Sequence, residues 1–212
     1  QIGLTPGIAG KKIIIQGLGN VGYNTAKVLM EFGAVIVGIC EYDGALYNPD
    51  GLDPDAIVEH RKNTGSILNY KKATNQFKNP AEGLEQACDI LVPAALENQL
   101  TEENIGRIKA KIIAEGANGP TTPGAEALFV KNGGIIIPDM YCNAGGVTVS
   151  YFEWLKNLSH VAFGRMDKRY EEMSNLNLVN TVETITGKSL TTAQRMAIVK
   201  GADELELVNS GL

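Results

Sequence analysis

Short apolar runs, rich in β-branched residues, recur along much of the chain, and each opens into a polar or small-residue loop. Runs of this kind, in which polar residues do not alternate with apolar ones, are typical of strands buried on both faces of a parallel sheet. Helical or loop patterns separate them, which predicts an α/β fold with a doubly wound, mostly parallel sheet. The runs cover residues 12–15, 34–40, 88–93, 111–115 and 134–138.

The first run ends in a glycine-rich turn, Gly17-x-Gly19-x-x-Gly22, where a helical pattern begins. A strand, a tight glycine turn and a helix start form the pyrophosphate site of Rossmann-type folds. Gly17 permits the sharp turn, Gly19 permits close approach of the phosphates, and Gly22 permits close helix packing. Asn20 and Val21 open the helix, whose unpaired N–H groups suit an anion.

The second apolar run ends in a carboxylate, Glu41, which follows Gly22 by 19 residues. Between them, Ala26, Leu29, Met30 and Phe32 give an apolar helical face that ends at Gly33. An acid at this position accepts hydrogen bonds from the adenosine ribose of a dinucleotide. The alternative is a polar residue at a strand end, but the complete strand–turn–helix–strand–acid unit favours the ribose. Because a carboxylate repels a 2′-phosphate, we expect NAD to be preferred over NADP.

Later strands open into loops that carry asparagines, Asn118 and Asn143. Ligands of open α/β sheets bind beyond the carboxyl ends of the strands, so we expect these loops to converge. An amide both donates and accepts, which suits a nicotinamide carboxamide or an amino acid. The alternative is turn chemistry, since each asparagine lies close to glycine. A helix is expected over residues 145–158, with Phe152 and Trp154 as core residues.

Composition narrows the class of protein. The 212 residues carry a net charge of −5 and 44% hydrophobic residues, enough for one good core. The acidic balance argues against nucleic acid, and no apolar stretch reaches membrane-spanning length. Cys40, Cys88 and Cys142 are widely spaced, which indicates reduced thiols without a metal site. Because the first residue is Gln1, we expect a piece or processed product of a longer chain.

Three longer strings resemble the cofactor domain of the glutamate dehydrogenase family: residues 16–22, 115–123 and 143–154. The resemblance runs over essentially the whole chain. It implies oxidative deamination of L-glutamate to 2-oxoglutarate and ammonia, with hydride transfer to NAD or NADP. By the same resemblance, Pro93 and Ala94 line the adenosine side, and Asn118 and Asn143 meet the nicotinamide end and the substrate. Val147 and Ser150 contact the glutamate side chain.

The catalytic lysine and aspartate of this family belong to a separate domain, reached through Gly-Gly-x-Lys. Here isoleucines follow Gly133-Gly134, so we expect no catalytic residue in this chain. We expect His60 and His160 to have structural rather than catalytic roles. Two alternatives stay open: a leucine, valine or phenylalanine dehydrogenase, which Ser150 disfavours, and a noncatalytic structural subunit.

The tail departs from a minimal dinucleotide domain, so we expect a Rossmann-type domain over residues 1–162 and a helical segment over residues 163–212. Apolar residues recur every three or four positions from Met166 to Ile185, before Gly187, and Thr191-x-x-Gln194 is typical of a capping box. The alternative is a helical pair packed on its own domain.

The tail resembles the antenna of the animal and protist enzymes, which implies a homo-hexamer and the mitochondrial matrix, or otherwise the cytoplasm. Asn209 stands where those animal enzymes have a GTP-site histidine, and the chain ends before the returning helix.

Overall fold

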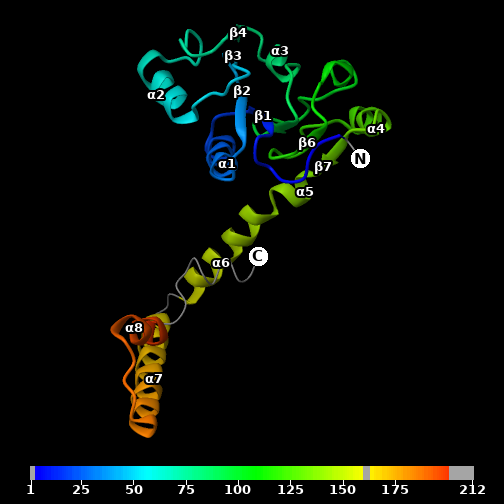
Figure 1. The fold of residues 1–212 in the computed structure, drawn as a ribbon. Coiled ribbons are helices and arrows are strands. Elements are labelled where there is room, and N and C mark those ends of the chain that lie inside the picture. The colour runs from blue at the N-terminus through cyan, green and yellow to red at the C-terminus, as the bar shows by residue number, and fades with distance from the viewer. Residues whose placement is uncertain (1–2, 160–162, 201–212) are drawn as a thin grey trace. The chain divides into compact units, whose positions relative to one another are not determined.

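The computed structural model describes residues 3–159 and 163–200 (Figure 1). The chain divides into two compact units, residues 1–144 and 145–212. The expected boundary after residue 162 falls within the second of them. His160 and Asn209 lie outside the described residues. Within the described ranges, no helix combines the length and apolar composition needed to cross a bilayer.

The first unit is built on a seven-stranded sheet of order β4-β3-β2-β1-β5-β6-β7. Strands β2, β1, β5, β6 and β7 run parallel, and β3 and β4 complete one edge in antiparallel pairing. The predicted Rossmann-type α/β fold is therefore confirmed. The strands are β1 (Lys12–Gln16), β2 (Val35–Glu41), β3 (Gly44–Tyr47), β4 (Asn75–Phe77), β5 (Ile90–Pro93), β6 (Ile112–Ala114) and β7 (Ile135–Ile137).

Alternate residues of β1 serve two cores on opposite faces of the sheet. Ile13 and Ile15 belong to one cluster and Ile14 to the other, and all three are fully buried. The register of β1 against β2 shifts by one residue next to Ile14, which pairs with Gly38. A Cβ on Gly38 would lie 2.8 Å from the Ile14 side chain, so only glycine fits this close approach.

Helices connect the strands of the first unit (Figure 1). The helix after the glycine turn buries Gly22 and Ala26, with Tyr23 and Leu29 partly buried. Met30 and Phe32 are 39% and 66% exposed, so their predicted place on the apolar face is wrong. The helices are α1 (Asn20–Glu31), α2 (Pro54–Thr64), α3 (Pro80–Leu84), α4 (Pro123–Lys131), α5 (Asp139–Cys142) and the 3-10 turn η1 (Ile105–Arg107).

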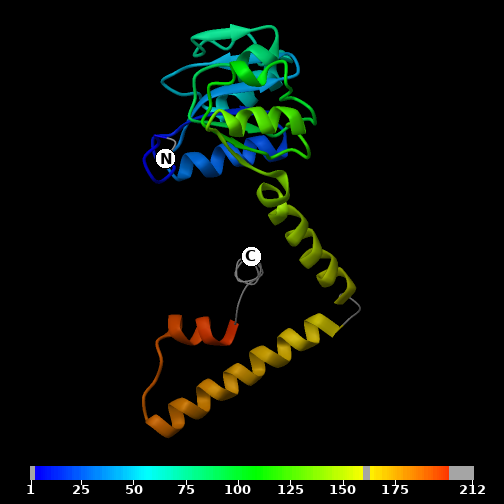
Figure 2. The ribbon, with the colours of Figure 1, turned by 90° about the vertical axis from the view of Figure 1, so that its right-hand side faces the viewer.

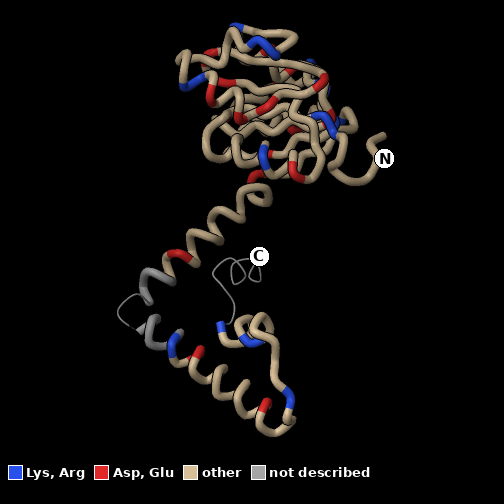
Figure 3. Tube along the Cα trace, turned by 60° about the vertical axis from the view of Figure 1, so that its left-hand side comes forward, with Lys and Arg blue, Asp and Glu red and all other residues tan. Residues whose placement is uncertain are grey.

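Two further expectations for this unit need correction. The run at residues 134–138 forms the edge strand β7, where Ile135 is 45% exposed because one side of the strand has no neighbour. The loop expected around Asn143 is only a short junction after α5, because the helix expected over residues 145–158 is present and already includes Gly145 and Gly146. Acidic and basic residues intersperse over this unit (Figure 3).

The described residues of the second unit form the helices α6 (Ala144–Ser159), α7 (Phe163–Thr186) and α8 (Thr192–Lys200) (Figure 2). The predicted long helix ends as expected, before Gly187 with φ of 65°. The capping box is confirmed, since the Thr191 N–H donates to Gln194 Oε1 at 3.1 Å and the Gln194 N–H to Thr191 Oγ1 at 3.3 Å. Trp154 is 54% exposed, so its predicted core role is wrong.

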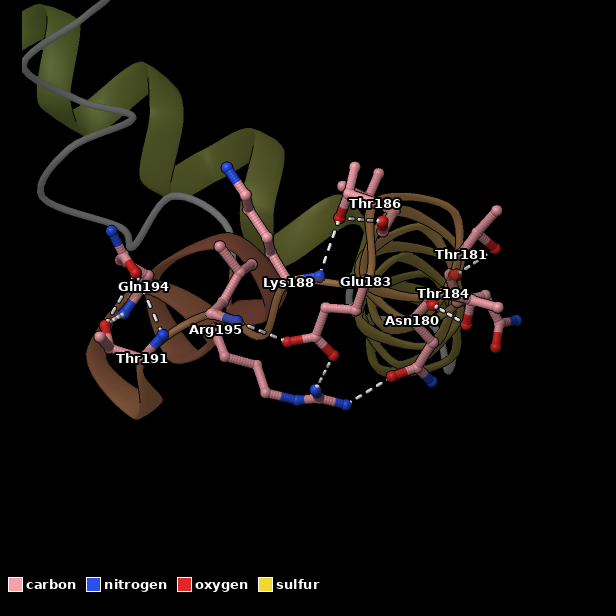
Figure 4. A network of polar contacts seen from close by, with 12 residues as sticks. Asn180, Thr181, Glu183, Thr184, Thr186, Lys188, Thr191, Gln194 and Arg195 are labelled. Atoms are coloured by element: carbon pink, nitrogen blue, oxygen red, sulfur yellow. Dashed lines mark hydrogen bonds and ion pairs between the residues drawn. The ribbon is translucent and has the colours of Figure 1, made fainter.

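Helices α7 and α8 pack on each other through a small buried strip and a polar network (Figure 4). Val179 is 3% exposed and Leu176 partly buried. The Arg195 guanidinium bridges Glu183 at 2.6 Å and the Asn180 side chain at 2.5 Å. Four other residues of the predicted apolar stripe stay exposed, namely Tyr170, Met173, Val182 and Ile185.

Candidate functional site

Three loops at the carboxyl ends of the parallel strands are joined by backbone hydrogen bonds. The Gly17 N–H after β1 donates to the Cys40 carbonyl of β2 at 2.7 Å. The Ala94 N–H after β5 donates to the Gln16 carbonyl at 2.9 Å. The Gly116 N–H after β6 donates to the Pro93 carbonyl at 3.0 Å. The loops therefore form one continuous edge, as the sequence predicts for an open α/β sheet.

The glycine turn has the geometry that an anion cradle needs. Gly17 has φ of 91°, and a Cβ there would lie 2.9 Å from the Ala94 carbonyl oxygen. A Cβ on Gly22 would overlap the Gly17 carbonyl oxygen, so the helix start lies directly against the turn. Gly19 differs, because its Cβ position faces open space. The residues present thus fit a dinucleotide pyrophosphate beside Gly19.

The start of α1 supplies donors next to this space. Gly19 is the N-cap residue, and it has no side chain that could occupy the first N–H groups of the helix. Asn20 is exposed and Val21 is 53% exposed, so the first turn is open to solvent. Unpaired N–H groups and the positive end of the helix dipole favour a bound anion here.

Glu41 lies against the same turn and is held from two sides. Its carboxylate oxygen Oε1 accepts the Leu18 N–H of the glycine turn. The same oxygen is 3.0 Å from Nη1 of Arg61, and the Glu41 side chain is only 10% exposed. The acid therefore faces the turn, as the ribose interpretation requires.

Sequence reasoning missed Arg61. It lies in the last turn of α2, and 20 residues separate it from Glu41. The only local signal is a basic residue near a helix C-terminus, which the helix dipole alone explains.

Pro93 and Ala94 take different positions in the second loop. Pro93 is buried, and its carbonyl receives the N–H groups of both Gly116 and Ala117. Ala94 is partly buried and lies beside the glycine turn, where its carbonyl oxygen limits position 17 to glycine. Ala94 therefore borders the open space, while Pro93 supports the loop.

The structure brings Asn118 and Asn143 together. The Asn143 side-chain amide donates to Asn118 Oδ1 at 2.6 Å. Two acids hold the surrounding backbone: the Asp139 N–H donates to Glu115 Oε2 at 3.1 Å, and the Gly119 N–H donates to Asp139 Oδ2 at 2.8 Å. Sequence reasoning missed these acids, although Glu115 ends one predicted strand and Asp139 directly follows another.

Val147 and Ser150 belong to the second unit, so the structure does not group them with the asparagine pair. Both lie on α6. Val147 is 72% exposed, and the Ser150 hydroxyl donates to the Gly146 carbonyl at 2.9 Å. The single O–H donor of Ser150 is therefore engaged within α6, and the two lone pairs of its oxygen stay available to accept hydrogen bonds.

Among the described residues, His60 and the three cysteines do not form an acid–base or nucleophilic pair at this edge. His60 Nε2 lies 2.9 Å from the Leu68 carbonyl, and its ring packs edge-on to Tyr70. The three cysteines are free thiols. Burial raises the pKa of the Cys40 thiol, and it raises that of Cys88 to about 12, so neither is a thiolate at neutral pH. No cluster suited to a metal ion occurs among the described residues.

Comparison with known proteins gives consistent matches. The family model "Glutamate/Leucine/Phenylalanine/Valine dehydrogenase" matches residues 3–209. A mitochondrial glutamate dehydrogenase of Dictyostelium discoideum is 51% identical over 212 residues, covering 100% of this chain and 42% of that protein. An NAD-specific glutamate dehydrogenase of Staphylococcus aureus is 49% identical over 150 residues, covering 71% of this chain and 36% of that protein.

Solved structures give the same result. Hetero-hexameric glutamate dehydrogenase from Thermus thermophilus superposes with a TM-score of 0.66 at 25% identity, over 99% of this chain and 48% of that one. Plasmodium falciparum glutamate dehydrogenase 2 has a TM-score of 0.60 at 26% identity, over 96% and 47% of the two chains. The chain spans less than half the length of these relatives.

Proposed function

Because the chain belongs to the glutamate/leucine/phenylalanine/valine dehydrogenase family, we propose that it is the nicotinamide-cofactor part of a glutamate dehydrogenase. The whole enzyme oxidatively deaminates L-glutamate to 2-oxoglutarate and ammonia. The observation that carries the proposal is the Glu41 carboxylate bonded to the Leu18 N–H, because this contact places an acid against an open glycine turn.

Each loop at the sheet edge has a separate task in binding. Gly17, Gly19 and Gly22, with the N–H groups of Asn20 and Val21, cradle the pyrophosphate. Glu41 accepts the adenosine ribose hydroxyls, and Ala94 borders the adenosine side, with the buried Pro93 supporting its loop.

The asparagine pair binds the other end of the cofactor. Their mutual hydrogen bond leaves the amide nitrogen of Asn118 and the carbonyl oxygen of Asn143 for a carboxamide or an amino acid. When bound, the nicotinamide ring accepts the hydride from the substrate α-carbon. Acid–base groups are proposed to come from a part of the enzyme outside this chain, because the carboxylates described at the sheet edge, Glu41, Glu115 and Asp139, each accept a backbone N–H.

Glutamate is the proposed substrate because of Ser150. The hydroxyl would turn from the Gly146 carbonyl to donate to a distal carboxylate, whereas a branched apolar side chain offers no acceptor for it. Val147, on the same helix, contacts the methylenes. A leucine, valine or phenylalanine dehydrogenase is therefore the less favoured enzyme, and a noncatalytic structural subunit has no specific observation in its favour.

Two relatives support a proposal for assembly and location. The Thermus relative is described as a hetero-hexamer and the Dictyostelium relative as mitochondrial. We extend these to a hexamer in mitochondria, with α7 and α8 as an antenna whose exposed apolar stripe contacts neighbouring subunits. NAD is the proposed main cofactor, since the Staphylococcus relative is described as NAD-specific, with NADP as a second.

Steady-state assays of the intact protein test the proposal. NADH formation from NAD is measured with L-glutamate, L-leucine, L-valine and L-phenylalanine in parallel, and calorimetry measures NADH binding. We expect binding of NADH and the highest kcat/KM with glutamate. A higher kcat/KM with an apolar amino acid overturns the substrate, and folded protein that binds no NADH overturns the function.

A further inference from the structure

We propose that Asn118 is a latent deamidation site and that the Asp139 carboxylate keeps it intact. Asn118 precedes Gly119, and at an Asn-Gly step the side-chain amide is lost readily, because glycine offers the attacking nitrogen little steric hindrance. The effect on the cofactor rests on the proposed function, since it concerns the nicotinamide end of the same site. The chemistry of the side chain does not depend on that function.

The reaction needs only water and the neighbouring peptide. The Gly119 nitrogen loses its proton and attacks Cγ of Asn118, so that an N–C bond forms and the bond from Cγ to the side-chain nitrogen breaks. That nitrogen leaves as ammonia, and a cyclic imide remains. Water then opens the ring at either carbonyl, which gives aspartate or isoaspartate. The first step therefore needs a Gly119 nitrogen that is free to deprotonate and to move.

Asp139 opposes this first step. Its Oδ2 accepts the Gly119 N–H at 2.8 Å. A carboxylate in this position stabilises the protonated nitrogen and repels the negative charge that develops when the proton leaves. The acid is itself held in place, because its N–H donates to Glu115 Oε2 at 3.1 Å and its Oδ1 accepts the Met140 N–H at 2.6 Å.

The residues around the Asn-Gly step are held by further contacts. The Asn98 N–H donates to the Gly119 carbonyl at 2.9 Å, and the next residue, Pro120, is buried. The Asn118 side chain is tethered separately, because its Oδ1 accepts the Asn143 amide at 2.6 Å. Asn118 and Gly119 are nevertheless both exposed, so hydrogen bonds, and not burial, protect the step.

The chain contains a second Asn-Gly step that lacks this protection. Asn132 and Gly133 directly follow α4, and both are exposed. The Gly133 N–H donates to a neutral acceptor, the Val130 carbonyl, at 2.9 Å. Within the described residues, the Asn132 side chain makes no hydrogen bond. Because the two steps share their sequence and their exposure, a difference between their rates reports the contacts around Asn118.

Deamidation would change the asparagine pair in a defined way. Oδ1 of residue 118 could still accept the Asn143 amide, but an oxygen would replace the amide nitrogen that we assign to the cofactor carboxamide. The new carboxylate would also stand next to Gly119, whose N–H is bonded to Asp139, so two like charges would repel each other. The nicotinamide end would thereby lose a donor.

Mass spectrometry of peptides from the intact protein, incubated at mildly alkaline pH, measures conversion at both Asn-Gly steps. The same protein unfolded in urea gives the rates without structure. The variants are Asp139→Ala and Asp139→Asn, of which the second keeps the shape of the side chain and removes its charge. The matched control is Glu126→Gln, which neutralises an exposed acid on α4. Circular dichroism checks the fold of each variant.

In the unsubstituted protein, we expect Asn118 to convert about tenfold or more slowly than in urea, and more slowly than Asn132, because a hydrogen bond to a charged group opposes the attack. Asp139→Ala should accelerate Asn118 about tenfold and leave Asn132 unchanged. Asp139→Asn should give a smaller acceleration, and Glu126→Gln none. An unchanged rate at Asn118 in both Asp139 variants, or an equal rise at Asn132, overturns the inference.

Asn118→Asp carries one product of the reaction and tests its consequence. Calorimetry should show NADH binding weakened about tenfold or more, because a donor is lost and a charge is added. Undiminished NADH binding in this variant overturns the functional part of the inference. Unsubstituted protein that binds no NADH overturns the proposed function itself, whereas the deamidation rates stand independently of that result.

Discussion

The side chain of Asn143 donates to that of Asn118 across 2.6 Å, although 25 residues separate them in the chain. One residue follows β6 and the other follows α5, so the bond joins two segments at the carboxyl edge of the sheet. It also orients both amides. The pair therefore forms a single polar unit, and its members should not act independently.

A double-mutant cycle tests this coupling. Asn118→Ala and Asn143→Ala should each weaken NADH binding, and the double variant should lose less than the sum of the two. Residues in direct contact show interaction energies of about 0.5–3 kcal/mol. Calorimetry on the four proteins measures it, with Asn63→Ala, at an exposed position of α2, as the control for a lost surface asparagine. Strictly additive losses would show that the pair does not bind the cofactor as a unit.

The parallel strands could be predicted because the chemistry is local to each run. Three consecutive isoleucines, Ile13 to Ile15, favour a strand buried on both faces of a sheet, and all three are fully buried. The turn after them needs glycine at position 17 for two local reasons, a positive φ and the nearby Ala94 carbonyl. The antiparallel strands β3 and β4 lack such runs and rely on pairing with distant residues.

Other parts of the site depend on contacts between residues that are far apart in the sequence. The contact of Glu41 with Arg61 joins a strand end to the last turn of a later helix, and no periodicity encodes it. The glycines near Asn143 indicated a loop, but helix α6 includes them, because Asn143 itself ends one helix just before the next begins. Trp154 lies on an exposed face of α6, where a large apolar residue alone does not indicate burial.

Gly19→Val should abolish measurable NADH binding without unfolding the protein. The backbone at Gly19 has φ of −81°, which valine adopts readily, and its Cβ position faces open space. The valine methyls would therefore fill the region proposed for the pyrophosphate, without displacing protein atoms. Calorimetry measures binding and circular dichroism checks the fold. Gly106→Val is the matched control, since Gly106 also has open space at its Cβ. Normal NADH affinity in Gly19→Val would contradict the placement of the phosphates.

Glu41→Ala should shift cofactor preference toward NADPH. Two like charges repel by on the order of 4 kcal/mol at about 4 Å and an effective dielectric near 20, before salt screening reduces it. Arg61 offsets part of this repulsion, so we expect a change of about tenfold in the ratio of the two Kd values, equivalent to ~1.4 kcal/mol. Fluorescence titration with both cofactors measures the ratio, and Glu59→Ala controls for a lost acid elsewhere. An unchanged ratio would mean that Glu41 does not face the ribose.

Ser150→Ala should weaken the binding of glutamate more than the binding of NAD in the intact enzyme. A hydrogen bond to a charged group contributes about 1.5–3 kcal/mol, so the KM for glutamate should rise by at least tenfold. Steady-state kinetics with each substrate varied separately measure the effect. Thr181→Ala is the control, because its hydroxyl donates to a carbonyl four residues earlier, as that of Ser150 does. A change confined to the KM for NAD would contradict the assignment.

Acid should loosen the α7–α8 hairpin through Glu183. Its carboxylate accepts the Leu190 N–H at 2.8 Å and pairs with Arg195 at 2.6 Å (Figure 4). The Leu190 hydrogen bond, followed by the nearby charge of Arg195, lowers the pKa of Glu183 below its ordinary value of 4.5. The open form thus binds the proton more tightly than the closed form. Glu183 therefore stabilises the hairpin above pH 4.5, and this contribution is lost as the pH falls through the lowered pKa.

Amide hydrogen exchange over residues 183–200, corrected for intrinsic rates, measures the opening at neutral pH and in acid. Protection in the unsubstituted protein should fall in acid. Glu183→Gln should be less protected at neutral pH and nearly insensitive to acid, because its side chain has no proton to gain. Glu171→Gln, on the exposed part of the same helix, should behave like the unsubstituted protein. If Glu183→Gln retains the full acid response, another group opens the hairpin, and the network around Arg195 is not its pH-sensitive link.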